Sequence, residues 1–308
     1  MQHRAAGMGL AALLALPLAF GALPAAAQKN LDESGSASGS DDVAGRVIVT
    51  MIAAWRESAR AGFGFGTHYG MFWTLLTPGA HAREGFTVTK GKTYRFVAVG
   101  DQSVEDLELR VGGVVRRTRK LAASNGRVSV VQYVAPRSGR VLARVQLADA
   151  RDRTAFVGLL AMEQESGPRT DAEMQAWDTR VAAVFQELGS NLSGFADDSA
   201  GIAGPPVVAT RPVPWMIYLM RISGKTAIRT DPTDWGAARV NVRVSAEQFS
   251  PITVSVVGAD RKALGVSPKS ASHAFQVDTQ GQPISVQLDR LGGERTSFAF
   301  LLLTRPAR

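Results

Sequence analysis

The spacing of apolar residues changes from helical to strand-like near residue 70. An i, i+3, i+4, i+7 pattern predicts an amphipathic helix that ends near the glycines of residues 62–66. Its apolar face would consist of Ile48, Met51, Ile52, Trp55 and Ala59. From Met71 onward, short β-branched, aromatic or alternating runs are separated by Gly, Pro, Asp or Asn. A helix followed by about seven such strands indicates an antiparallel β-sandwich.

This pattern repeats in the second half of the chain. A breaker-rich segment at residues 163–170 predicts a linker, and a second helical stripe follows with Thr170 or Asp171 as its N-cap. Strand-like runs resume after a long loop at residues 194–214. Four matches occur in the same order in both halves: DRTAFVGLL (152–160) with ERTSFAFLL (294–302), Trp73 with Trp215, RVQL (144–147) with SVQL (285–288), and LRVGG (109–113) with SVVGA (255–259). We therefore predict a mainly β protein of two tandem antiparallel, jelly-roll-like β-sandwich domains, each preceded by an amphipathic α-helix.

The N-terminal residues have the pattern of an export signal. Arg4 precedes an apolar stretch, and three alanines at residues 25–27 provide a cleavage site, so residues 1–27 are predicted to be a signal peptide. A retained anchor is the alternative, but the apolar stretch is short and contains Pro17. We expect a periplasmic or extracellular protein whose mature chain has no transmembrane span. The predicted boundaries are a disordered leader at 28–42, domain 1 at 43–162, the linker at 163–170 and domain 2 at 171–308.

Composition narrows the chemistry that the chain can perform. Its 308 residues include no cysteine, which excludes disulfides, thiol nucleophiles and cysteine-ligated metals. The histidines beyond the leader are His68, His81 and His273, and no two of them have metal-ligand spacing. No GxSxG motif is present, and the two GKT triplets lack the glycine of a phosphate-binding loop. We therefore predict no enzymatic activity, no cofactor and no bound metal.

One stretch of the first half resembles a known family. An alternating strand leads into Gly100-Asp101, an acidic strand DLEL (106–109) follows, and a Pro-Arg-Ser-Gly turn (136–139) precedes further strands. This arrangement resembles the bacterial pre-peptidase C-terminal type of β-sandwich, a jelly-roll-like accessory module, over residues 70–162 and most clearly over 94–147. The resemblance implies a module that binds, spaces or targets rather than catalyses. The second half departs from it, because ITVS (252–255) replaces the acidic strand.

Two groups of residues are candidate binding sites. The densest basic run consists of Arg110, Arg116, Arg117, Arg119 and Lys120. It would either hold phosphates, lipopolysaccharide or an acidic polysaccharide, or form the solvated tip of a hairpin. The second group, Phe63, Phe65 and Tyr69, lies among glycines. These rings would either form an exposed surface that stacks on sugars or a partner, or fill the space between helix and sandwich.

A third group, of acids, allows two interpretations. Asp101, Glu105, Asp106 and Glu108 would either coordinate Ca²⁺ or lie on the solvent face of a strand, and the second interpretation is favoured.

We interpret the chain as a non-catalytic, exported binding or assembly protein of the bacterial cell envelope or extracellular space. It would recognise a protein, a glycan or an anionic envelope surface, and no nucleic acid, because no stacking platform for bases is visible. The alternative is a secreted hydrolase, or a hydrolase inhibitor, that uses the loop at 194–214. Its plausible acids would be Asp197, Asp198 and Asp231.

Overall fold

The computed structural model describes residues 40–66, 70–113, 127–193, 215–222, 227–290 and 296–304, with backbone alone at 40–49, 113, 188–193 and 215. Most of these residues lie in antiparallel strands, which confirms the mainly β prediction. Two long helices accompany them, α3 (Ser40–Arg60) and α4 (Asp171–Ser193). Within the described ranges, neither is long and apolar enough to cross a membrane.

A nine-stranded sheet runs through the whole molecule. Its order is β14-β11-β16-β9-β2-β8-β4-β6, and the short strand β1 also pairs with β8. The bounds are β14 (Ser272–Asp278), β11 (Arg239–Ala246), β16 (Ser297–Thr304), β9 (Trp215–Ile222), β2 (Gly70–Leu76), β8 (Ala155–Gln164), β4 (Thr93–Gly100), β6 (Val128–Val134) and β1 (Phe63–Gly64). The first half of the chain contributes β2, β8, β4 and β6, and the second half contributes β9, β16, β11 and β14.

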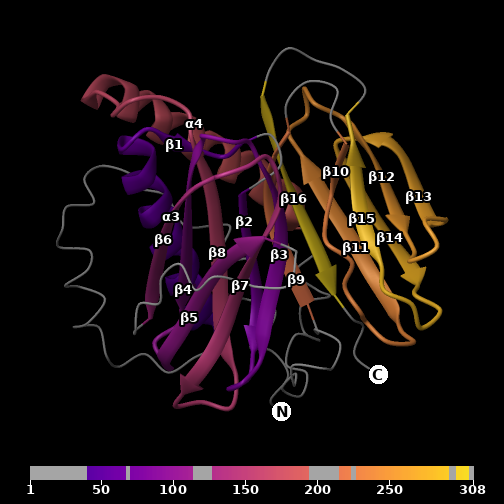
Figure 1. Ribbon diagram of the computed structural model, residues 1–308. Helices are drawn as coiled ribbons and strands as arrows, with labels where there is room; N and C mark the ends of the chain where they lie inside the picture. Colours follow the sequence, from indigo (N-terminus) through magenta and orange to yellow (C-terminus); the bar gives the residue numbers. More distant parts are fainter. Residues whose placement is uncertain are drawn as a thin grey trace.

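Each half also contributes a small sheet. The first-half sheet has the order β3-β7-β5, with β3 (His81–Val88), β7 (Gly139–Ala150) and β5 (Val104–Gly113). The second-half sheet has the order β10-β15-β12-β13, with β10 (Ala227–Arg229), β15 (Ser285–Asp289), β12 (Ile252–Val257) and β13 (Ala263–Ser270). Figure 1 shows these two sheets as separate groups of strands, one in each half of the molecule.

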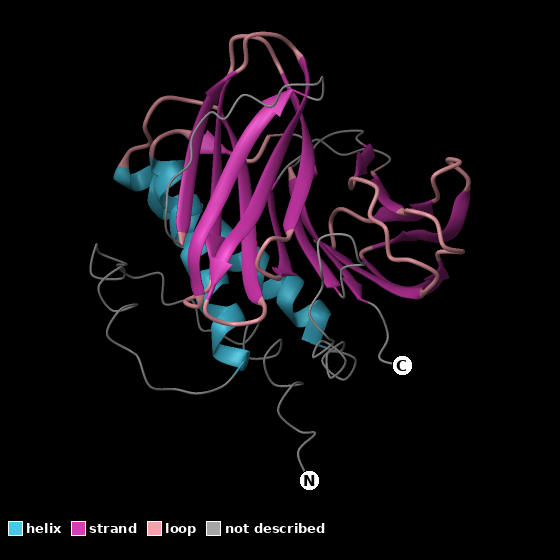
Figure 2. Ribbon diagram, turned by 60° about the horizontal axis from the view of Figure 1, so that its bottom comes forward, coloured by secondary structure: helices cyan, strands magenta, loops and turns pink. Residues whose placement is uncertain are grey.

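The two faces of the nine-stranded sheet pack into different cores. Phe72 and Trp73 are neighbours in β2, and their side chains point to opposite faces because strands alternate. Phe72 packs with residues of both small sheets in the larger core. Trp73 packs instead with Met51 and Trp55 of α3 and with Val184 of α4. The helices therefore cover one face of the large sheet, and they gather on one side of the strands in Figure 2.

The two halves join directly through antiparallel pairing of β2 with β9. Phe72 lies opposite Tyr218, and Gly70 lies opposite Met220. A Cβ atom at Gly70 would collide with the carbonyl oxygen of Leu219, so only glycine allows this close approach. Because this pairing creates one continuous sheet, the prediction of two separate sandwich domains, 43–162 and 171–308, is wrong. The linker expected at 163–170 separates sequence halves but not two sheets.

Tight packing holds α3 to the large sheet, and an ion pair joins the two helices. A Cβ atom at Gly158 of β8 would collide with the sulfur of Met51, which shows how closely α3 approaches the sheet. Arg56 of α3 makes a two-bond ion pair with Asp178 of α4, at 2.7 and 2.8 Å. At the start of α4, Thr170 is the N-cap: its backbone N–H donates to the Glu173 carboxylate at 2.7 Å, in a capping-box arrangement.

Candidate functional site

The outer face of the β3-β7-β5 sheet carries a line of three arginines, which we call the arginine row: Arg83, Arg144 and Arg110. Strand register places Arg83 directly opposite Arg144, and Arg144 directly opposite Arg110. The strands lie side by side in Figure 1. Adjacent strands are about 4.8 Å apart, so the row spans about 10 Å across the sheet. Like charges directly opposite each other destabilise a sheet, and an anionic ligand would relieve this repulsion.

A parallel line of polar side chains lies next to the arginine row, and we call it the polar row: His81, Gln146 and Glu108. The same register places Gln146 opposite both His81 and Glu108. Arg144 donates a hydrogen bond to the Gln146 side-chain oxygen at 3.1 Å, and Arg110 pairs with Glu108. These contacts hold two of the three guanidinium groups in place.

The arginine row also affects the histidine beside it. Partial burial and the positive charges of Arg144 and Arg83 lower the pKa of His81 below its ordinary value. At neutral pH the imidazole is therefore uncharged, with one ring nitrogen that donates and one that accepts a hydrogen bond. The polar row thus combines hydrogen-bonding groups with little added positive charge.

The small sheet of the second half lacks an equivalent of the arginine row. The match of RVQL with SVQL aligns Arg144 with Ser285, and Ser285 lies opposite Val257 on the neighbouring strand. Neither residue is charged, whereas the first-half sheet has three arginines in line. The positive line belongs to one half of the molecule, although both halves have a small sheet in the same position.

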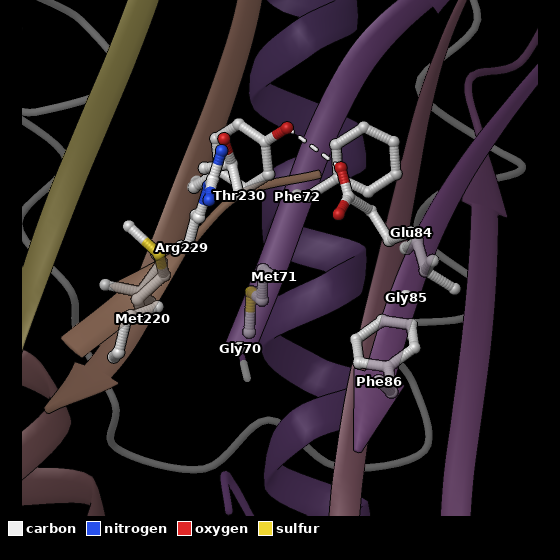
Figure 3. Close-up of a pocket in the computed structure, with 13 residues that line it drawn as sticks. Gly70, Met71, Phe72, Glu84, Gly85, Phe86, Met220, Arg229 and Thr230 are labelled. Carbon is white, nitrogen blue, oxygen red and sulfur yellow. Dashed lines mark hydrogen bonds between the residues drawn. The ribbon is translucent and has the colours of Figure 1, made fainter. Parts of the chain in front are cut away.

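A small cleft lies where the two halves meet, with a volume of about 50 Å³. Its lining comes from β2, β3 and β8 of the first half, from β9 and β10 of the second half, and from the residue that follows β10. Figure 3 shows Glu84 pointing from β3 toward the second half, with a dashed line marking its hydrogen bond to Tyr218. The remaining lining is largely apolar and includes Phe72, Phe86 and Met220.

Glu84 is a buried acid with a strongly raised pKa. Burial raises the pKa of Glu84 to about 7, against the opposing effects of the hydrogen bond from Tyr218 and the positive charge of Arg140. The Tyr218 hydroxyl donates to the Glu84 carboxylate at 2.8 Å. Burial and the neighbouring carboxylate raise the pKa of Tyr218 well above its ordinary value, so this hydroxyl remains a donor at neutral pH. Glu84 therefore changes its charge near neutrality inside a cleft between the halves.

Arg140 of β7 connects the two halves beside this cleft. Its guanidinium pairs with Asp231, which follows β10 in the second half. Its charge also acts on Glu84, and its side chain occupies the space where a Gly85 Cβ atom would lie. The Asp231 side chain is mostly buried, so the acid that the sequence offered for hydrolysis is held by an ion pair near the cleft.

The structure tests only some of the predicted binding residues. Four members of the basic run, Arg116, Arg117, Arg119 and Lys120, lie outside the described residues, as does Tyr69. The fifth, Arg110, lies in the arginine row. Asp197 and Asp198 of the hydrolase alternative also lie outside the described residues.

Phe63 and Phe65 do not form an exposed stacking surface. They are 3% and 2% exposed and belong to the core beneath the helices. Phe65 stacks on Trp55 with ring centroids 4.3 Å apart, and the Arg95 guanidinium lies 4.3 Å above Phe63. The pairing of β1 with β8 draws this segment under α3, which is why its aromatic rings are buried. Their assignment as binding residues is therefore wrong.

Three of the four candidate calcium ligands, Asp101, Glu105 and Glu108, have structural partners. One oxygen of Asp101 accepts hydrogen bonds from the Ser103 backbone and hydroxyl, and the other accepts from the Phe156 backbone. Glu105 pairs with Arg151 at 3.5 Å. Within the part of the chain that the structure describes, no group of three or more metal-ligating side chains is assembled.

The arginine row and the cleft escaped sequence reasoning because neither is local. Arg83, Arg110 and Arg144 are far apart along the chain, and strand register alone brings them together. The sequence signal that could have found them is that each of three strand-like runs has an arginine at a polar position of its alternating pattern. Glu84 and Tyr218 are 134 residues apart and have no local motif.

Comparisons with known proteins leave the family open. No protein-family model matches the chain, and no curated protein matches it. Three solved structures are weakly similar, each with a TM-score of 0.21. Peruvianin-I, a cysteine peptidase from Thevetia peruviana latex, is 12% identical over 30% of this chain and 51% of its own, and an arabinoxylan arabinofuranohydrolase of glycoside hydrolase family 43 from Bacillus subtilis is 16% identical over 34% of this chain and 23% of its own. Tandem CBM22 domains from Paenibacillus barcinonensis are 10% identical over 73% of this chain and 83% of their own. The chain spans about half of the first protein and about a quarter of the second. TM-scores this low carry no argument about function.

Proposed function

We propose that this protein is a non-catalytic binding protein that holds an anionic partner on the outer face of the β3-β7-β5 sheet. The observation that carries the proposal is the arginine row, in which Arg83, Arg144 and Arg110 lie side by side in strand register. A guanidinium group presents several donors in a plane that matches carboxylate, sulfate or phosphate oxygens. Three of them in line offer an acidic partner several charge-assisted hydrogen bonds at once.

The comparison between the two halves supports this proposal. Like charges directly opposite each other destabilise strand pairing, so the pairing of the strands does not explain the arginine row, and the second-half sheet has the uncharged Ser285 and Val257 at the aligned positions. We propose that the two halves arose by duplication and that the first half then specialised in anion binding. The same strand order in both halves supports the duplication, with β2-β8-β4-β6 matching β9-β16-β11-β14. We further propose that the protein acts after export, as a component of the cell envelope or the extracellular space.

The test compares two triple variants of equal charge. Arg83→Gln, Arg110→Gln and Arg144→Gln together remove the arginine row, while Arg153→Gln, Arg239→Gln and Arg261→Gln remove three exposed arginines elsewhere. Dextran sulfate is immobilised, and the dissociation constant is measured over a range of salt concentrations. We expect binding to weaken at least about a hundredfold in the first variant, or about 1 kcal/mol for each lost contact, and to change little in the second.

The salt dependence provides a second criterion. Exposed ionic contacts are screened over about 8 Å at physiological ionic strength, so binding by the unaltered protein should weaken as salt increases. Equal losses in the two triple variants would mean that overall net charge, rather than the arginine row, drives binding, and the proposal would then fail.

A second candidate function is hydrolysis in the cleft, which one observation favours. Glu84 has a pKa of about 7, a value suited to a general acid, and Asp231 lies nearby in its ion pair with Arg140. The test is to incubate the protein with soluble polysaccharides and to measure the reducing ends that hydrolysis releases. Activity that disappears in Glu84→Gln and survives in Glu105→Gln would establish it, and no release above a buffer blank would exclude it for the polysaccharides used.

A further inference from the structure

The outer face of the β3-β7-β5 sheet carries two parallel rows with different chemistry. Each of its three strands contributes one arginine and one polar residue two positions away. The pairs are Arg83 with His81 on β3, Arg144 with Gln146 on β7, and Arg110 with Glu108 on β5. The face therefore has a cationic line and, beside it, a line of groups that donate and accept hydrogen bonds.

From this arrangement we infer that the anionic partner is a linear acidic polysaccharide that lies across the three strands. Its acidic groups would face the arginine row, and its hydroxyl groups would face the polar row. This inference rests on the proposed function and names the class of ligand. Hydroxyl groups both donate and accept hydrogen bonds, which suits the neutral imidazole of His81 and the amide of Gln146.

The spacing of the arginines favours a polymer over a single anion. Neighbouring strands are about 4.8 Å apart, a separation comparable with the length of one pyranose ring. A chain with one acidic group per sugar would therefore meet one guanidinium per residue. A free phosphate or a monosaccharide acid would reach one or two of the three arginines and would bind more weakly.

The same rows argue against an anionic membrane and against a polyphosphate backbone. Glu108 lies within the array and would be repelled by a flat anionic surface, whereas a polymer directs its charges to the arginine row alone. The row that flanks the arginines on the other side consists of Gly85, Leu142 and Gly112, and it offers one large apolar side chain for insertion into a lipid layer. A polyphosphate chain has no hydroxyl groups and leaves the polar row without partners.

The experiment separates the role of each row with two polymers. Polygalacturonate carries both carboxylates and hydroxyls, and inorganic polyphosphate carries charge without hydroxyls. The variant His81→Phe keeps the size of one side chain of the polar row and removes its hydrogen bonds, and it leaves intact the contact by which Gln146 holds Arg144. We expect its affinity for polygalacturonate to fall about tenfold, a loss of about one hydrogen bond, and its affinity for polyphosphate to stay unchanged. The Gln triple variant of the arginine row should lose affinity for both polymers.

Each other outcome has a distinct meaning. If the triple variant loses affinity and the polar-row variant binds both polymers normally, anion binding stands and the polysaccharide inference is overturned. If the triple variant binds as the unaltered protein does, the proposed function itself fails. Tighter binding to phosphatidylglycerol vesicles than to polygalacturonate, or equal affinity for galacturonate and its polymer, would also overturn the inference. Circular dichroism and thermal melts check that both variants fold.

Discussion

Replacing Glu84 by glutamine should remove most of a pH-dependent loss of stability. The folded protein holds a proton on Glu84 up to about pH 7, whereas an unfolded chain releases it near the ordinary value of 4.5. Between these two pKa values the folded state binds more protons than the unfolded state, so the free energy of unfolding falls as pH rises. The stabilising contribution is fully present below about pH 4.5 and is lost as pH rises through about 7.

The size of the effect follows from the pKa difference. One pKa unit corresponds to about 1.4 kcal/mol, so a rise from 4.5 to about 7 corresponds to about 3 kcal/mol between pH 4 and pH 8. The side chain is almost fully buried, so solvent screening reduces this value little. Glutamine is neutral at every pH and retains an oxygen that accepts the hydrogen bond from Tyr218.

The assay is urea unfolding at pH 5 and pH 8 for the unaltered protein, Glu84→Gln and Glu105→Gln. Other titrating groups contribute equally to all three proteins, so the difference between their pH dependences isolates Glu84. We expect Glu84→Gln to lose less stability from pH 5 to pH 8 than the unaltered protein, by about 2–3 kcal/mol. Glu105 is an exposed acid, and its variant should follow the unaltered protein. If Glu84→Gln shows the same pH dependence as the unaltered protein, Glu84 is not a buried acid with a raised pKa.

Three further changes test contacts of the cleft and of α4. Tyr218→Phe removes a hydrogen bond that lowers the pKa of Glu84, so the pH-dependent loss of stability should move to higher pH in the same urea series. Arg180 of α4 forms an ion pair with the fully buried carboxylate of Glu247. Arg180→Ala leaves this carboxylate without its ion-pair partner and should lower the free energy of unfolding by about 3 kcal/mol, measured at pH 7. Gly70→Ala should lower the free energy of unfolding by at least about 2 kcal/mol, because the new methyl group would collide with the Leu219 carbonyl oxygen where the halves meet. The control, Gly167→Ala, adds a methyl group in open space and should change the free energy of unfolding by less than about 1 kcal/mol.

The sequence matches between the two halves predict the correspondence of strands better than the positions of single residues. RVQL and SVQL fall on β7 and β15, with Val145 and Val286 both buried. The match of LRVGG with SVVGA is displaced by one residue, because Leu109 is buried in the core while Ser255 lies in a half-exposed position of its strand. Side chains alternate along a strand, so a shift of one residue moves every side chain to the opposite face. A match between amphipathic strands therefore indicates which strands occupy similar places in the two halves more reliably than it indicates their register.

Local periodicity was sufficient to predict the mainly β class and the helices near residues 48–59 and after Thr170, because such elements depend on residues that are close together in the chain. Only the tertiary structure decided that β2 pairs with β9, because edge strands of either half have unpaired backbone groups that no local pattern assigns to a partner. The same long-range register created the arginine row and brought Glu84 to Tyr218. Burial likewise depends on what packs over a residue, and this is why Phe63 and Phe65, aromatic residues among glycines, became core residues instead of a surface.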